Sequence, residues 1–321
     1  MFKSRFLFAA MFLIAALFPS CTREDDSLTN QPDVADTSVS QPDSTFNACG
    51  ASWSLFSVGE NRKVRFSKGN LQFSSVGSHQ TIAGTSFGTF FFAYNQYDYI
   101  GQDNASVSDS TYTGRIDQLC WGSSGWHVQP NSEKDGDYDI ESLTGLESYA
   151  DWGVFNAISN GGNVPGRWRT LTQQEWDYLV NLRTTSTVDS VSDARYVEAT
   201  VCGVAGLILF PDLFIRPQAI EPFSNINQNN FNISFDDNVY DAGEWALLER
   251  AGAIFLPAAG FRGGTWLSTV GEGGSYWAST CNSARQAYAM LFIDGLVNAS
   301  AECTYDKDRG YGRSVRLVSD N

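Results

Sequence analysis

Histidine and basic residues are scarce in this chain of 321 residues. The two histidines, His79 and His127, lie 48 positions apart, and there is no Cys-x-x-Cys pair. A structural zinc site needs closely spaced His and Cys ligands, so we expect no metal site of this kind. Lys and Arg number 21 against 36 Asp and Glu, which gives a formal net charge of −15. A chain this acidic is not expected to hold nucleic acid or an anionic membrane by general electrostatics.

Long apolar runs are also lacking. The apolar run near the N-terminus, Phe6–Phe18, has 13 residues, whereas a helix that spans a bilayer needs roughly 20. Lys3 and Arg5 precede this run and Pro-Ser-Cys21 follows it, which predicts a lipoprotein signal peptide over residues 1–20 with lipid on Cys21. Secretion without the lipid is the alternative. Cleavage would remove two basic residues and no acid, so the mature net charge would be −17.

The chain after the signal predicts a tether and then a folded domain. Residues 21–45 are rich in Ser, Thr, Gln, Pro and Asp and have too few apolar residues for a core, which predicts a disordered tether. The acidic residues directly after Cys21 resemble the surface-export signal of some Gram-negative outer-membrane lipoproteins. That resemblance implies a lipid-anchored protein on the outer membrane, exposed at the cell surface. Residues 46–321 contain no second linker of this composition and predict one domain.

The pattern of elements predicts an α+β fold. Thr172–Arg183 and Asp241–Arg250 each begin with a capping box and continue with a spaced apolar stripe, which predicts two short helices. Elsewhere, short alternating stretches between glycines predict strands in mixed or antiparallel sheets with glycine-rich loops. Residues 64–73 predict a strand or hairpin edge around a Gly-Asn turn, and residues 314–318 predict a last strand. We expect these N- and C-terminal strands to pair.

One predicted strand near the C-terminus is apolar on both faces, which is typical of a central, buried strand. The two faces are expected to carry Ala289, Leu291 and Ile293 toward the core and Tyr288, Met290 and Phe292 on the other side. The preceding Tyr276 and Trp277 are expected to be fixed packing residues.

The cysteines leave several pairings open. Five remain after Cys21, an odd number that cannot all pair within one chain. Among the possible pairs, Cys281 with Cys303 is the favoured disulfide. We expect Cys120 and Cys202 to be buried free thiols.

Two motifs suggest chemistry but lack the context that it needs. Ser86 lies in a G-x-S-x-G sequence, yet the segment that follows predicts a strand, whereas a nucleophile elbow leads into a helix. Asp135–Asp139 has the spacing that begins an EF-hand loop. It lacks the glycine at position 6, which is Ile140, and the acid at position 12, which is Leu146. We therefore interpret the Ser86 motif as a glycine-rich turn. We interpret Asp135–Asp139 as a solvated acidic turn, with weak calcium binding as the alternative.

Seven phrases spread in order over residues 64–318 carry a family resemblance. They are "VRFSKGNLQF", "FAYNQYDYIG", "ADWGVFNAISNGG", "WRTLTQQEWDYL", "AGAIFLPAAGFR", "YWAST" and "YGRSVRLV". They resemble the major paralogous domain family of bacterial surface lipoproteins. The resemblance implies a C-type lectin-like fold related to formylglycine-generating, sulfatase-modifying enzymes. It also implies that the C-terminal strands can be diversified in some relatives.

The resemblance also allows the enzyme alternative to be weighed. Formylglycine-generating enzymes hold copper(I) with two cysteines five residues apart, in the segment that aligns with residues 274–286; two thiolates suit this soft ion. Here the positions five before and five after Cys281 are Tyr276 and Gln286, so the second thiolate would have to come from Cys303. We therefore expect a non-catalytic protein without a cofactor.

The C-terminal strands and loops carry the residue types of a recognition surface. Tyr and Arg give a large contact area with a polar end, and Ser and Asn give adaptable hydrogen bonds. We expect a cell-surface lipoprotein that binds a protein or glycan there; the alternatives are a formylglycine-generating-type enzyme and a fimbria-associated structural or adhesin subunit. The predicted ligand-binding residues are Thr280, Asn282, Ser283, Arg285, Gln286, Asn298, Glu302, Tyr305, Lys307, Asp308, Arg309 and Tyr311.

Overall fold

The computed structural model describes seven stretches of the chain, and they belong to one compact unit that runs from Ser38 to Asn321. Cys21, the predicted signal peptide and nearly all of the predicted tether lie outside these stretches. No helix in the described part has the length and apolar character that crossing a membrane requires. The described residues are 45–75, 80–82, 85–108, 114–130, 140–283, 285–298 and 309–321.

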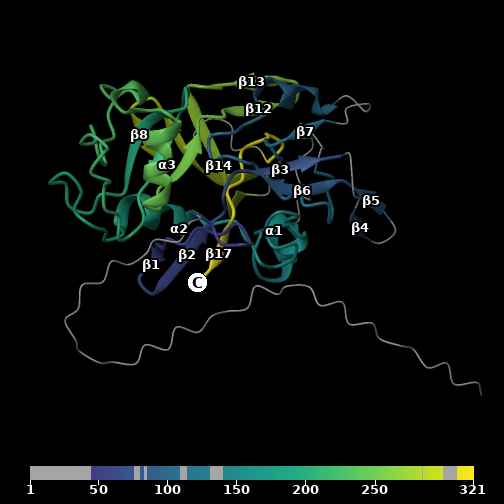
Figure 1. Cartoon of the computed structure of the whole chain (residues 1–321). Coiled ribbons are helices and arrows are strands. Elements are labelled where there is room, and N and C mark those ends of the chain that lie inside the picture. Colours follow the sequence, from purple (N-terminus) through teal and green to yellow (C-terminus); the bar gives the residue numbers. More distant parts are fainter. Residues whose placement is uncertain are drawn as a thin grey trace, which may run out of the picture. The chain divides into compact units, whose positions relative to one another are not determined.

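Short strands dominate the described residues, with few short helices, so the α+β prediction is confirmed (Figure 1). The sheets, with their strands in spatial order, are β1 (Phe56–Gly59), β2 (Arg62–Phe66), β17 (Val318–Asp320); β10 (Val239–Tyr240), β8 (Tyr196–Val201), β9 (Val204–Leu209), β11 (Ile254–Pro257); β14 (Gly273–Ser283), β15 (Gln286–Ile293), β16 (Leu296–Asn298); β6 (Thr89–Phe92), β3 (Leu71–Ser74), β7 (Arg115–Ile116); β12 (Phe261–Gly263), β13 (Trp266–Ser268); and β4 (Gln80–Ile82), β5 (Thr85–Phe87).

The first and last strands of the described chain share one sheet, as expected. β17 pairs antiparallel with β2, with Val318 opposite Phe66. The last strand begins later than the predicted residues 314–318, because Ser314 forms only an isolated bridge to Tyr276. The prediction of a hairpin edge over residues 64–73 is wrong. β2 and β3 belong to different sheets, because the backbone between them forms hydrogen bonds with the C-terminal segment. The Ser67 amide donates to the Leu317 carbonyl and the Leu71 amide donates to the Val315 carbonyl.

Two helices begin at the predicted capping boxes. α2 (Gln173–Asp177) follows Thr172, whose hydroxyl accepts from the Glu175 amide, and it continues as a π-helical turn, η3 (Tyr178–Leu182). α3 (Ala242–Arg250) has the same reciprocal arrangement between Asp241 and Glu244. The remaining helical segments were not predicted. They are η1 (Gly101–Ser108), η2 (Gly145–Ala150), α1 (Trp152–Phe155) and η4 (Phe235–Asp237).

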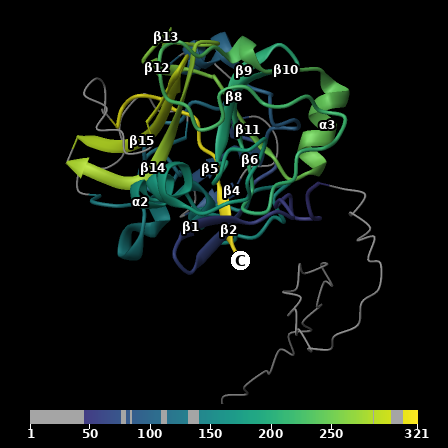
Figure 2. The ribbon, with the colours of Figure 1, turned by 90° about the vertical axis from the view of Figure 1, so that its left-hand side faces the viewer.

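The sheet formed by β14, β15 and β16 divides the core. Tyr276, Met290 and Phe292 pack into one apolar cluster, while Trp277 and Ala289 pack into another on the opposite face. This confirms the buried packing roles of Tyr276 and Trp277 and the central position of β15. Figure 2 shows the long β14–β15 ribbon with α2 below it.

One residue of the predicted core-facing set differs. Ile293 is 39% exposed because it ends β15, opposite Gly273 and Leu296 at the rim of the sheet.

Candidate functional site

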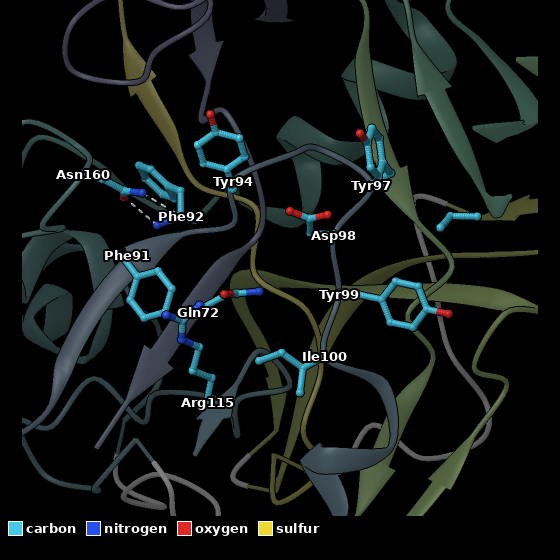
Figure 3. Close-up of a pocket in the computed structure, with 11 residues that line it drawn as sticks. Gln72, Phe91, Phe92, Tyr94, Tyr97, Asp98, Tyr99, Ile100, Arg115 and Asn160 are labelled. Carbon is cyan, nitrogen blue, oxygen red and sulfur yellow. Dashed lines mark hydrogen bonds between the residues drawn. The ribbon is translucent and has the colours of Figure 1, made fainter. Parts of the chain in front are cut away.

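A pocket of about 610 Å³ opens over the sheet formed by β6, β3 and β7 (Figure 3). Side chains alternate across a strand, so Phe73 and Phe90 point into the core. Gln72 and Phe91 lie opposite each other on the other face, which forms the floor of the pocket. Arg115 of β7 lies on the same face, and its guanidinium stacks over the Phe91 ring at 4.9 Å. The alternation of three strands therefore places an aromatic ring, an amide and a cation together.

The segment after β6 forms a wall of the pocket with three tyrosines: Tyr94, Tyr97 and Tyr99. Tyr94 is 85% exposed, although large aromatic side chains are usually covered in a folded protein. Tyr97 is partly covered and contacts the Cys202 thiol; burial first, and this contact second, raise the pKa of its hydroxyl. Tyr97 therefore stays neutral at physiological pH and keeps a hydroxyl that can donate and accept.

A buried glutamine fixes this tyrosine segment to the core. The Gln96 side chain is fully buried and points away from the pocket. Its Oε1 accepts from the Phe255 amide at 2.9 Å and from Arg316 Nη2 at 2.6 Å, and its Nε2 donates to Glu249 at 2.9 Å. A second anchor lies at the far end, where the Ile100 amide donates to Asp117 at 2.9 Å. The pocket wall is thus held in place by buried hydrogen bonds, which makes the site preformed.

Two polar side chains in the pocket have hydrogen-bonding capacity left for a ligand. Gln72 is only 6% exposed, and its side-chain amide has no hydrogen-bond partner among the residues that the structure describes; Figure 3 shows it directed into the pocket. Asp98 lies between the rings of Tyr94 and Tyr97 in the same view. Its Oδ2 accepts from the Asn95 backbone amide at 2.8 Å, and Asn95 Nδ2 donates to Oδ1 at 3.3 Å and to Oδ2 at 3.2 Å; these bonds orient the carboxylate and leave a lone pair of Oδ1 unused.

Asn160 completes the pocket but has a structural role. Its Oδ1 accepts from the Phe92 amide at 2.7 Å and its Nδ2 donates to the Phe92 carbonyl at 2.9 Å. The side-chain amide therefore closes the edge of β6 as a neighbouring strand would. The remaining wall is apolar and comes from Ile100 and Val204.

The predicted C-terminal residues are only partly brought together. Asn282, Ser283, Arg285 and Gln286 lie exposed at the end of the β14–β15 hairpin. Asn282 Nδ2 donates to Gln286 Oε1 at 3.3 Å, and the Tyr288 hydroxyl donates to Asn282 Oδ1 at 3.0 Å. This group, Asn282, Ser283, Arg285, Gln286 and Tyr288, is called the hairpin tip below.

Other members of the predicted surface do not share this position. Arg309 is fully buried, with its guanidinium 4.3 Å from the centre of the Trp121 ring, and it donates to the Ser283 carbonyl at 2.7 Å. Its prediction as an exposed ligand residue is wrong, because cation–π packing and a backbone acceptor hold it inside. Thr280 accepts from the Gln173 amide at 3.2 Å, at the start of α2.

Two further predicted residues lie apart from the hairpin tip. Tyr311 packs edge-on against Phe261 and Trp266, with ring centres 5.9 Å apart in both pairs. Asn298 ends β16, opposite Leu291. The remaining predicted positions lie outside the described residues: Glu302, Tyr305, Lys307 and Asp308.

The cysteines correct one prediction. Cys281 has a free thiol, so the expected disulfide with Cys303, a residue outside the described stretches, is not formed. The reason is its packing: Cys281 pairs with Ala287 across the sheet and contacts the apolar cluster beneath. Cys120 and Cys202 form no disulfide either; the expected burial holds for Cys120, whereas Cys202 is only partly buried.

The described residues do not form a catalytic site at the Ser86 motif or a cluster of metal ligands. Ser86 lies in β5 and is followed directly by another strand, β6, so the strand-to-helix turn of a nucleophile elbow is not formed there. The acidic segment Asp135–Asp139 lies outside the described residues. Within the described stretches, no three or more His, Cys, Asp or Glu side chains form a group that could hold a metal ion.

No protein-family model, curated protein or solved structure matches the chain. What the pocket can do therefore follows from its own side chains.

The pocket was not predicted as a site, although its sequence gave a signal. Tyrosines at 94, 97 and 99 alternate with polar residues directly after an aromatic strand. A solvated connection does not need three large aromatic side chains in six residues, so this density was an available indication of a binding segment.

Proposed function

We propose that this protein is a non-catalytic binding protein, anchored by lipid on Cys21 at the outer surface of the outer membrane, that holds a ligand in the tyrosine pocket. The observation that carries the proposal is the preformed pocket itself. It combines aromatic walls with a few converging polar groups, and sites of that composition usually bind ligands. The exposed Tyr94 and the Gln72 amide, which has no hydrogen-bond partner among the described residues, both gain contacts when a ligand enters.

The hairpin tip is the second candidate surface, and it keeps the expectation of recognition by the C-terminal strands. In its favour, the exposed Asn282 and Gln286 and the half-buried Tyr288 form a connected set of donors and acceptors on a two-stranded ribbon. It is the less favoured site because its side chains already form hydrogen bonds with one another.

We also propose the C-type lectin-like fold and membership of the major paralogous domain family. Three features of the structure support this. The terminal strands pair, a capping box opens α2 at Thr172, and the aromatic pair Tyr276–Trp277 lies buried beneath the last segment of the chain.

The binding proposal is tested by probing arrays of immobilised glycans and extracellular proteins with the purified protein. The wild type should bind defined spots, and Tyr94→Ala should lose them. Tyr149→Ala is the matched control, since Tyr149 is also an exposed tyrosine but lies outside the pocket. Loss of the same spots with Asn282→Ala, but not with Tyr94→Ala, would assign binding to the hairpin tip. Absence of any bound spot would contradict the proposal.

The anchoring proposal is tested separately with Cys21→Ser in cells supplied with labelled palmitate. The wild type should take up the label and sediment with outer membranes, whereas the variant should do neither. Protease added to intact cells should degrade the wild type, because the domain is expected on the outer surface. Label uptake by the Cys21→Ser variant would contradict lipid attachment at this cysteine.

A further inference from the structure

We infer that the ligand of the tyrosine pocket is an uncharged saccharide, with its ring against the tyrosines and its hydroxyls on Asp98 and Gln72. This assignment rests on the proposed binding function and specifies the chemistry of the ligand. It follows from three properties of the pocket: the shape of its apolar surface, the type of its polar groups and the balance of its charges.

The apolar surface suits a sugar ring. A pyranose has a face of C–H groups that is flat and weakly polar, while hydroxyls project around its edge. The rings of Tyr94 and Tyr97 rise on two sides of Asp98 in Figure 3, and Phe91 lies on the floor. Aromatic rings bury such C–H surface, and the tyrosine hydroxyls remain at the wet edge. An aliphatic ligand would also bury area here, but it would leave the polar groups of the floor unpaired.

The polar groups suit hydroxyls in particular. Asp98 is held by the Asn95 backbone amide through Oδ2 and by the Asn95 side-chain Nδ2 through both carboxylate oxygens, so its orientation is fixed and Oδ1 keeps a lone pair that can accept a ligand hydroxyl. Charge-assisted bonds of this kind are stronger than those between neutral groups. The Gln72 amide carries both a donor and an acceptor, and a hydroxyl is the ligand group that can satisfy either. A ligand with adjacent hydroxyls would therefore complete both side chains.

The charges favour an uncharged ligand over an acidic one. Arg115 and Asp98 contribute opposite charges to the lining, so the pocket has no net positive charge among its described residues. Arg115 is already engaged over the Phe91 ring. The chain as a whole carries −15, which repels polyanions such as acidic polysaccharides. An acidic glycan would lose more from this field than it gains from one engaged cation.

The test uses the full mature protein and calorimetric titration with named saccharides. Neutral mannan, galactan and glucan oligosaccharides are compared with polygalacturonate and heparin fragments at equal salt. We expect at least one neutral saccharide to bind, and both acidic probes to give no heat. Tyr94→Ala and Asp98→Asn should each weaken binding about tenfold or more, since each removes an aromatic contact or a charge-assisted bond. Gln72→Leu should do the same, whereas the control Tyr149→Ala should leave affinity unchanged.

The outcomes separate this inference from the proposed function. Binding of a protein from the array that is lost with Tyr94→Ala, together with no binding of any saccharide, would overturn the inference while the proposed function stands. Binding of the acidic probes alone would overturn it as well. Saccharide binding that Tyr94→Ala, Asp98→Asn and Gln72→Leu leave intact would overturn both the inference and the pocket. Because Asp98→Asn keeps the shape of the side chain, a loss of binding in a variant with unchanged thermal unfolding cannot come from misfolding.

Discussion

Glu198 on β8 is a buried carboxyl group whose environment disfavours its charge. It is 2% exposed, and its Oε2 accepts from the Gly295 amide at 2.9 Å, while its Oε1 has no hydrogen-bond partner within the described stretches. Burial is the main cause that raises its pKa, from 4.5 to about 7, and the carboxylates of Asp294 and Asp237 add to the rise. We predict that Glu198→Gln removes a large part of the pH dependence of stability.

The sign and size follow from proton linkage. Between about pH 4.5 and 7 the folded state binds more protons at Glu198 than the unfolded state does, so the free energy of unfolding falls as the pH rises through this range. A difference of about 2.5 pKa units corresponds to about 3–4 kcal/mol, since each unit is worth about 1.4 kcal/mol. Glutamine can accept from the Gly295 amide without ever carrying a charge. The free energy of unfolding of the variant should therefore be close to that of the wild type at pH 4.5 and exceed it by about 3–4 kcal/mol at pH 8.

Urea unfolding followed by circular dichroism at pH 4.5 and pH 8 measures this difference. Asp117 and Asp151, whose burial raises their pKa to about 6, act with the same sign, but they are present in both proteins and cancel in the comparison. The exposed Glu221→Gln is the matched control and should change neither value. An equal difference between wild type and Glu198→Gln at both pH values would refute the reasoning.

Three further substitutions test other parts of the structure. Glu175→Ala removes the buried carboxylate that pairs with Arg169 at 2.8 Å and caps α2, and it should lower the free energy of unfolding by about 2–3 kcal/mol in urea; a loss under 1 kcal/mol would contradict this. Gln96→Leu should cost about 3 kcal/mol, because it leaves the buried Arg316 guanidinium short of an acceptor. It should also speed amide exchange in the tyrosine segment, and unchanged exchange there would show that Gln96 does not hold the wall. Cys281→Ser should remove one maleimide label from the native protein by mass spectrometry, and an unchanged label count would show that this thiol is not accessible as a free group.

The helices show what local sequence can predict. The capping boxes at Thr172 and Asp241 involve residues within one turn, so both helix starts could be found without knowledge of the fold. The π-helical end of the first helix depends on distant groups, since Arg183 donates to the Phe210 carbonyl on another segment. α1 is likewise fixed from outside, because its cap Asp151 also accepts from the Thr170 amide. Ends and short helices set by such contacts leave no periodic signal.

The strands show the limit of alternation as a signal. Alternation over residues 64–73 indicated extended chain correctly, yet it could not reveal that β2 and β3 join different sheets. The partners of that turn, Val315 and Leu317, lie some 250 residues away in the sequence. Residue type misled in a similar way for Arg309, whose charge suggested exposure; the Trp121 ring that covers it comes from a remote segment.

The tyrosine pocket shows why a preformed site escapes prediction and what makes it rigid. Its floor, wall and rim come from Gln72, residues 94–100 and Asn160, which only the fold brings together. Within the wall, the residue that does not face the pocket matters as much as those that do. Gln96 ties the tyrosines to Arg316 in the C-terminal segment, so the geometry of the wall depends on the packing of the last residues of the chain. Since a wall that is already ordered loses little conformational entropy when a ligand binds, this buried link favours affinity. Two roles are thus divided within the segment. Gln96 fixes the positions of the tyrosines, and the tyrosines determine which ligand binds.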